Sequence, residues 1–238
     1  TLSFEPIVAA GCDVLVIDHH LGAETLPPAR AVVNPNRQDE SGEFSYLCAA
    51  GVVFLLLVAT NRQLRAEGVA GPDLMPLLDL VALATVADVA PLVGLNRALV
   101  RQGLKVMAEG RRPGLAALAG VAGTKGAPST YSLGFVIGPR INAGGRVGAA
   151  DLGARLLATE DPDEAAALAE RLHRLNAERR EIEAGVLAAA EARVLANGAE
   201  GPLVWAAGEG WHPGVVGIVA ARLKERFHRP AVVIGFAF

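Results

Sequence analysis

The feature that most constrains the fold is an unbroken helical pattern of about 35 residues, from Pro162 to about Ala196. Asp161 is suited to cap its N-terminus, proline is favoured in a first helical turn, and Asn197-Gly198 can end it. Helices of globular domains usually run about 8–20 residues, and the sequence pattern changes completely after this one. A spacer between two domains therefore fits better than the alternative, a coiled coil.

Short strands and helices are predicted on both sides of this helix. Before it, the apolar runs Cys12–Ile17 and Ala31–Val33 indicate strands, the first of them buried and parallel. Helices are expected at residues 45–65 (capped by Ser45 and buried nearly all round), 73–88, 96–109, 113–119 and 151–159. After it, strands at 203–205 and 231–234 flank a helix at 214–227, which makes a βαβ unit. The fold class is therefore α/β, with a first domain in 1–160, a connecting helix in 161–198 and a second α/β domain starting at 199.

Composition excludes several classes of protein. The formal net charge is −3, so a nucleic-acid partner would have to be held by a local basic patch. The two cysteines, Cys12 and Cys48, are too few for a disulfide scaffold or a cysteine zinc finger, and both are expected to be buried. The longest uncharged apolar run, 47–59, is shorter than the roughly 18 residues that cross a bilayer. We expect a cytoplasmic protein with no membrane partner.

Asp18, His19 and His20 follow the first predicted strand directly. Ligands of open α/β sheets bind at the carboxyl ends of the strands, and the chain leaves the sheet there. Imidazole nitrogen and carboxylate oxygen together suit Mn, Zn or Fe. A capped turn with a chance pair of histidines is the structural alternative, but two of only five histidines adjacent at a strand end favour a site.

Asp88 is the second candidate, at the end of a very apolar predicted helix. A carboxylate in such surroundings is costly unless it is paired or binds a metal. The alternative is a helix-end aspartate turned to solvent. Asp79, earlier in the same helix, competes for any role given to Asp88.

Two glycine-rich stretches complete the set of candidates. Residues 134–148 interrupt the helical pattern, and Arg140, Asn142 and Arg146 among these glycines predict a phosphate site, the alternative being a loop with solvated arginines. In the stretch 208–214, Trp211 is suited to stack a nucleobase and His212 to reach a phosphate. Their alternatives are a core tryptophan and a local cap.

In this order the motifs resemble the DHH phosphoesterase family, and within it the RecJ-type exonucleases specific for single-stranded DNA. The resemblance covers nearly the whole chain. It is carried by VIDHH at 16–20, VNPN at 33–36, ATVADVAPL at 84–92, GPRINA at 138–143 with Gly145-Arg146, and GWHPGVVGIVA at 210–220. Gly144 stands where the family pattern has alanine, a small departure. The chain then corresponds to a parallel-sheet DHH domain without its first strands, the connecting helix and the start of a DHHA1-type nucleic-acid-binding domain.

The resemblance implies a two-metal phosphodiester hydrolase that uses Mn²⁺ or Mg²⁺, digests single-stranded DNA from 5′ to 3′, and serves DNA repair and recombination. By this resemblance, His19 and Asp88 are metal ligands, Asp18 is a ligand or orients one, and His20 faces the scissile phosphate. Arg140, Asn142 and Arg146 grip the DNA backbone, while Trp211 and His212 bind the strand in the second domain. A single-strand-binding protein or a helicase is the expected protein partner.

The family pattern also needs aspartates from two earlier motifs, and before Asp18 the sequence offers only Glu5 and Asp13. Because it starts at Thr1 without methionine and stops after an apolar run, we expect an internal portion of a longer enzyme that is inactive alone, binds at most one ion loosely and exposes an apolar sheet edge. Two alternatives stay open. One is a DHH-family pyrophosphatase or a phosphoesterase for short oligonucleotides or pAp. The other is a non-catalytic module that binds DNA or a replication partner.

Overall fold

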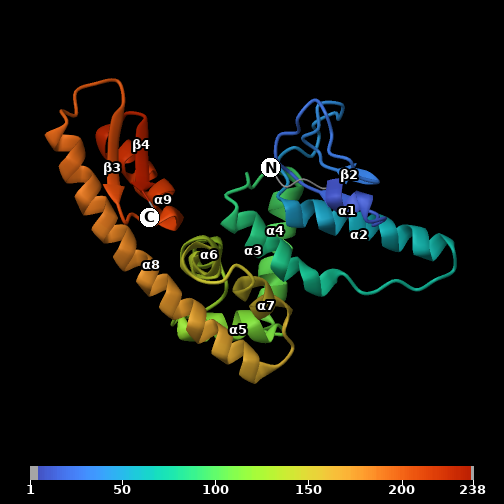
Figure 1. Cartoon of the computed structure of the whole chain (residues 1–238). Coiled ribbons are helices and arrows are strands. Elements are labelled where there is room, and N and C mark those ends of the chain that lie inside the picture. Colours follow the sequence, from blue (N-terminus) through green and yellow to red (C-terminus); the bar gives the residue numbers. More distant parts are fainter. Residues whose placement is uncertain (1–4, 237–238) are drawn as a thin grey trace. The chain divides into compact units, whose positions relative to one another are not determined.

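A computed structural model of the chain describes residues 5–236 and divides them into two compact units (Figure 1). Unit 1 comprises residues up to Arg111 together with Lys125–Gly138, and unit 2 comprises Arg112–Thr124 together with residues from Pro139 onward. Residues 112–124 and 139–160 thus belong to the unit of the long helix and not to the unit of the first strands. The domain boundaries expected at 160 and 198 stay predictions.

The two strands of unit 1 form a small parallel sheet. β1 (Leu15–Ile17) pairs with β2 (Ala31–Val33), residue for residue from Leu15 opposite Ala31. The parallel pairing was predicted, but the first strand is shorter than expected and is not buried, since Leu15 is 66% exposed. Within residues 5–236 this sheet holds only these two strands, so each has one edge without a strand partner. Cys12 is likewise exposed, against expectation, whereas Cys48 is buried.

Within the described residues before 109, unit 1 also contains five helical segments. They are α1 (Glu5–Ala9), α2 (Ala49–Ala66), the 3₁₀ turn η1 (Met75–Leu77), α3 (Leu78–Ala87) and α4 (Gly94–Ala108). Cys48, not Ser45, precedes the first turn of α2, and the expected burial of this helix is wrong because Val53 and Val58 are exposed. A Cβ on Gly103 would overlap the carbonyl oxygen of Leu78, so glycine allows α4 to pack tightly on α3.

The glycine-rich stretch expected to interrupt the helices is itself helical. It forms the π-helical turn η2 (Ser132–Ile137) and continues directly into α6 (Gly138–Val147). In unit 1, a Cβ on Gly138 would lie 2.8 Å from the carbonyl oxygen of Leu133 and 3.2 Å from the Cβ of Ala87. Close packing against the end of α3 therefore explains this glycine, and the predicted break in the helical pattern is wrong.

Unit 2 is organised by the long helix α8 (Pro162–Ala196), whose predicted bounds are confirmed (Figure 1). The carboxylate of Asp161 accepts hydrogen bonds from the backbone N–H groups of Asp163 and Glu164, as expected of a cap. Helices α5 (Pro113–Val121) and α7 (Leu152–Ala158) pack against it.

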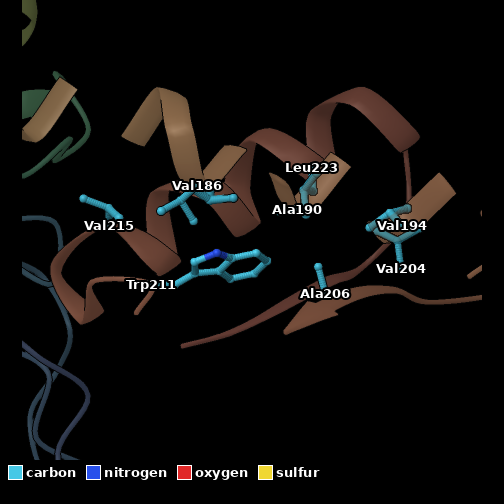
Figure 2. Close-up of a cluster of buried hydrophobic side chains, with 9 residues drawn as sticks. Val186, Ala190, Val194, Val204, Ala206, Trp211, Val215 and Leu223 are labelled. Carbon is cyan, nitrogen blue, oxygen red and sulfur yellow. The ribbon is translucent and has the colours of Figure 1, made fainter. Parts of the chain in front are cut away.

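The predicted βαβ unit follows α8. It consists of β3 (Val204–Glu209), α9 (Pro213–Phe227) and β4 (Ala231–Phe236), with the two strands parallel. One face of this sheet packs with α8 and α9 around a core that contains Trp211 (Figure 2). Trp205 and Phe236 are about half exposed on the strands. No helix within residues 5–236 is both long enough and apolar enough to span a membrane.

Candidate metal site

Asp18 organises the turn that follows β1. Its backbone N–H donates to the carbonyl of Val33, which ties the turn to β2. Its Oδ1 accepts from the backbone N–H groups of His19 (2.7 Å) and His20 (3.2 Å), and lies 2.7 Å from Nδ1 of His20. The carboxylate of Asp18 therefore fixes the backbone and one ring of the triplet, as an orienting residue does.

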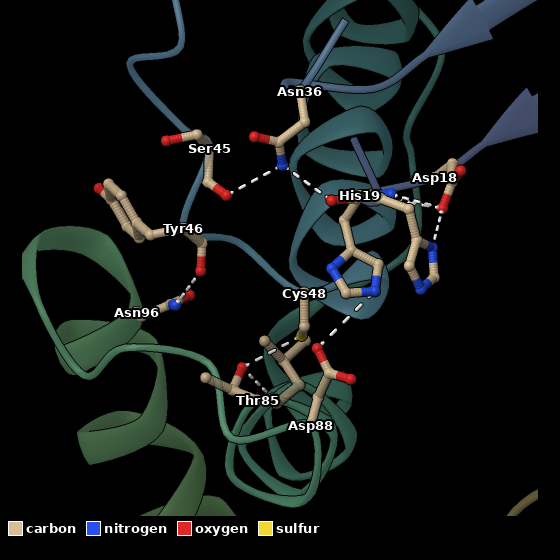
Figure 3. Close-up of polar contacts among 11 residues, drawn as sticks. Asp18, His19, Asn36, Ser45, Tyr46, Cys48, Thr85, Asp88 and Asn96 are labelled. Atoms are coloured by element: carbon tan, nitrogen blue, oxygen red, sulfur yellow. Dashed lines mark hydrogen bonds and ion pairs between the residues drawn. The ribbon is translucent and has the colours of Figure 1, made fainter. Parts of the chain in front are cut away.

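Two asparagines after β2 hold the triplet from the other side. The side chain of Asn34 donates to the carbonyl of His20, and its Oδ1 accepts from the N–H of Asn36. The Nδ2 group of Asn36 donates both to the carbonyl of His19 (2.8 Å) and to that of Ser45 (3.0 Å) (Figure 3). The Asn-Pro-Asn motif thus supports the backbone beneath the two histidines.

The structure brings His19 and Asp88 together from distant parts of the sequence of unit 1. Asp88 directly follows α3, and its Oδ2 lies 3.7 Å from Nε2 of His19 (Figure 3). The competing Asp79 lies in the first turn of α3, 4% exposed, and nine residues of helix place it about 13 Å further along the axis. Asp88 is therefore the aspartate at the site.

The donor atoms of His19 and Asp88 fit a shared divalent ion. Imidazole nitrogen and carboxylate oxygen each bind such ions at about 2.0–2.2 Å, so two ligands of one ion lie about 3–4 Å apart. Within residues 5–236, no cluster of three or more His, Cys, Asp or Glu side chains is arranged to hold a metal. The described part of the chain thus offers two candidate ligands rather than a closed coordination sphere.

The pKa values of Asp18 and His20 move apart because the two groups form a pair. The Asp18 carboxylate raises the pKa of His20 by its hydrogen bond and its charge, and the charge of Asp88 adds to this. Partial burial alone would raise the pKa of Asp18, but the hydrogen bonds from the His20 side chain and from the backbone N–H groups of His20 and His19 outweigh it and lower that pKa. The raised pKa of His20 extends upward the pH range over which its imidazole is protonated.

We expect His20 in the metal-free protein to titrate above the ordinary histidine value of 6.5. The ion pair stabilises the fold only between the lowered pKa of Asp18 and the raised pKa of His20, and its contribution is lost as the pH rises through the latter. An NMR titration of the imidazole in wild type and Asp18→Asn measures this. The variant should titrate lower than wild type, and equal midpoints would contradict the pairing.

Arg140, Asn142 and Arg146 lie in α6, within unit 2. Nε of Arg140 donates to Nδ1 of His173 on α8, and burial together with the charge of Arg180 lowers the pKa of Arg140. A side-chain N–H of Arg146 donates to the carbonyl of Gly214 at the start of α9. Asn142 is exposed. The predicted phosphate contacts and the predicted metal ligands thus belong to different units.

Trp211 and His212 have structural roles in unit 2. Trp211 is 8% exposed in the core, with the guanidinium of Arg193 5.2 Å from its ring centroid, so the expectation that it stacks a nucleobase is wrong (Figure 2). Close approach of the sheet buries it, since a Cβ on Gly208 would overlap the ring. Nδ1 of His212 accepts from the N–H of Gly214 and caps α9.

The polar groups behind the site were not predicted from the sequence. Asn96 and Thr85 are fully buried, and both contact the segment that precedes α2 (Figure 3). The sequence did contain one signal for these groups, because Thr85 is a polar residue within a very apolar helix. Asn96 was interpreted only as the start of an amphipathic helix.

Comparison with known families identifies the region that carries this site. Residues 1–85 match the model of the DHH family, N-terminal domain. Residues 1–85 are therefore similar to the N-terminal domain of the DHH family. This stretch contains the Asp18-His19-His20 triplet and both asparagines of the supporting motif, whereas Asp88 follows just beyond it.

Known exonucleases are similar to the chain along nearly its whole length. The single-stranded-DNA-specific exonuclease RecJ of Dickeya dadantii is 46% identical over 241 residues, which cover 95% of this chain and 41% of that protein. RecJ of Thermus thermophilus in complex with Mn²⁺ is 38% identical with a TM-score of 0.83, over 98% of this chain and 34% of that one. The same protein with Mg²⁺ is 36% identical with a TM-score of 0.75, over 94% and 33%.

These likenesses confirm the predicted α/β fold class and the predicted resemblance to the RecJ-type branch of the DHH family. The chain spans about two fifths of the length of the curated RecJ protein it matches.

Proposed function

We propose that this chain is part of a single-stranded-DNA-specific exonuclease that hydrolyses phosphodiesters from 5′ to 3′ with Mn²⁺ or Mg²⁺, in DNA repair and recombination. The observation that carries the proposal is the pairing of His19 Nε2 with Asp88 Oδ2 at 3.7 Å. Two residues far apart in sequence meet there with the donor atoms a divalent ion requires. Support also comes from the RecJ relatives, whose solved structures hold Mn²⁺ and Mg²⁺.

Each residue of the triplet has a distinct role in this proposal. His19 and Asp88 would hold one ion, and Asp18 keeps the backbone of the triplet in place. The exposed ring of His20, whose protonated form is favoured by its partner Asp18, faces the scissile phosphate and in that form offsets its negative charge. Metal ions, when bound, stabilise the attacking water and the leaving oxygen.

The arginines of α6 are proposed to hold the DNA backbone. Arg140 and Arg146 supply planar guanidinium forks suited to phosphate, and the exposed Asn142 adds an amide donor. His212 is proposed to contact the strand near the start of α9. These assignments rest on the resemblance and on the exposure of Asn142 and Arg146.

We expect Arg146→Ala to weaken binding of single-stranded DNA for all sequences and to flatten its dependence on salt. Each phosphate contact on a single strand contributes about 0.7 to the slope of log K against log salt. Binding titrations at several salt concentrations measure the slope. Because Arg146 also ties α6 to α9 through the carbonyl of Gly214, the thermal stability of the variant is measured beside it. An unchanged slope would remove Arg146 from the DNA path.

A non-catalytic DHH module that binds DNA or a replication partner is the second candidate. It is favoured by one observation: the described residues bring only two metal ligands together. A pyrophosphatase or a phosphoesterase for short oligonucleotides is less well supported, because the relatives found are exonucleases and match the chain through the long helix as well.

The test uses a protein of RecJ length that carries this chain, incubated with Mn²⁺ and with DNA labelled at the 5′ or the 3′ end. The proposal predicts early release of labelled mononucleotide from the 5′-labelled single strand, and little from the 3′-labelled strand or from duplex DNA. Binding without hydrolysis would support the non-catalytic module, and hydrolysis of pyrophosphate or dinucleotides alone would support the third function. A single-strand-binding protein or a helicase as partner, and a cytoplasmic location, are proposed along with this function.

A further inference from the structure

A short segment before α2, residues 45–48, bridges the two halves of the candidate metal site. We refer to it as the strap (Figure 3). At one end, Nδ2 of Asn36 links the carbonyl of Ser45 to that of His19. At the other end, the thiol of Cys48 lies 3.4 Å from the hydroxyl of Thr85, which also donates to the carbonyl of Val81 within α3. The strap thus lies between the strand end with His19 and the helix that leads to Asp88.

Asn96 makes the central connection of this bridge. Its side chain is 0% exposed, and its Nδ2 donates to the carbonyl of Tyr46 in the strap (2.7 Å) and to that of Pro91 (3.0 Å). Both amide hydrogens are engaged, which fixes the orientation of the amide. Its Oδ1 has no hydrogen-bond partner within residues 5–236. The two hydrogen bonds that Nδ2 donates are therefore what compensates for burying this amide.

The backbone is strained close to Pro91, the second residue to which Asn96 donates. Val89, directly after Asp88, has a φ of +57°, a left-handed conformation that a β-branched residue rarely adopts. Such a conformation persists only where its surroundings impose it. The N–H of Ala90 donates to the carbonyl of Thr85, and Asn96 secures the carbonyl of Pro91. Together these bonds fix the turn that starts at Asp88.

The helix that carries Asn96, α4, is packed tightly against α3. The close contact at Gly103 packs α4 onto α3, so the helix that carries Asn96 cannot shift freely against the helix that precedes Asp88. The hydroxyl of Tyr46 accepts from the N–H of Leu95, which secures the strap to the N-terminus of α4. The same short framework is therefore linked to the segment of His19 through Asn36 and to the segment after Asp88 through the carbonyl of Pro91.

We propose that Asn96 is a positioning residue that sets the separation of His19 and Asp88 through its two hydrogen bonds, to the strap and to the turn after Asp88. The ion that this pair would receive rests on the proposed function, whereas the positioning itself does not. Groups that orient metal ligands typically change metal affinity by about 10–100-fold when they are removed.

The test compares Asn96→Ala with Asn61→Ala. Asn61 is a matched control, because it is also a buried asparagine of unit 1 whose Nδ2 donates to a carbonyl, that of Pro72, and it contacts Gly71 rather than the strap. Asn96→Asp and Asn61→Asp form a second pair of nearly unchanged volume, for use if either alanine variant is not folded. Two quantities are measured in the 238-residue chain: the NMR signals of the His19 imidazole and the Asp88 amide without metal, and the dissociation constant for Mn²⁺ from the EPR signal of the free ion.

We expect Asn96→Ala to shift the signals of both His19 and Asp88 and to weaken Mn²⁺ binding by about tenfold or more. Asn61→Ala should lower the thermal stability but leave the signals and the dissociation constant unchanged. Unchanged His19 and Asp88 signals in both Asn96 variants would overturn the proposal, and so would equal changes in the Asn61 variants. If the wild-type chain binds no Mn²⁺ but the signals respond to Asn96 alone, the positioning role stands and the proposed metal site fails.

Discussion

His19→Ala should abolish Mn²⁺-dependent hydrolysis of single-stranded DNA in a protein of RecJ length that carries this chain. The imidazole is one of the two proposed ligands that the described residues bring together, and its Nε2 lies 3.7 Å from Oδ2 of Asp88. Losing a ligand should cost more than losing a group that only orients one, so we expect a fall in rate of more than about 100-fold. Release of mononucleotides from a labelled single strand measures the effect, with circular dichroism to show that the fold is retained.

Asp88→Ala should behave in the same way, and Asp79→Ala provides the matched control. Both aspartates belong to the α3 region, but Asp79 is buried in the first turn of that helix. We expect its removal to lower the free energy of unfolding while the turnover of folded protein stays near normal. Near-normal turnover in His19→Ala or Asp88→Ala, or selective loss of turnover in Asp79→Ala, would contradict the assignment.

Trp211→Ala should destabilise unit 2 by about 3–5 kcal/mol, because it leaves a large cavity in the core between the sheet, α8 and α9. Trp205→Ala is the matched control. Trp205 lies on β3 in the same unit but is 49% exposed, so its loss should cost about 1 kcal/mol or less. Urea unfolding monitored by circular dichroism gives both values. Equal losses for the two tryptophans would contradict the core placement of Trp211.

Local signals in the sequence were sufficient for the long helix and the βαβ unit. Asp161 caps α8, Pro162 occupies its first residue, and Gly198 follows it with a φ of +83°, so each signal acts within a few residues of the end it determines. The strands of the βαβ unit were also found, because their apolar runs are bounded by clear turn residues.

Tertiary packing explains the errors. The glycines at 134–148 were interpreted as a break, but Gly138 allows a helix to approach the end of α3 closely, a contact that no local pattern reveals. Trp211 follows a turn that resembles a ligand-binding loop, yet Gly208 leaves space for its ring beneath the sheet. A glycine-rich stretch is compatible both with a loop and with close packing of two elements, and the sequence alone does not distinguish these two cases.

The sequence was sufficient to predict which residues carry the donor atoms of the candidate site. It was not sufficient to predict the residues that hold them in place. A strand that ends in Asp18-His19-His20 places donor atoms at a sheet edge by topology alone. Asp88 was recognised because a carboxylate ends a very apolar helix. Asn96 was not, since its two acceptors, the carbonyls of Tyr46 and Pro91, are backbone groups whose positions depend on how α4 packs on α3.

Binding of Mn²⁺ to the 238-residue chain tests most directly the central claim, that His19 and Asp88 hold one divalent ion. EPR titration of wild type, His19→Ala, Asp88→Ala and Asp79→Ala gives the number and strength of the sites. We expect one weak site in wild type and in folded Asp79→Ala, and none in the other two. A site that persists in both His19→Ala and Asp88→Ala would show that these two residues are not the ligands.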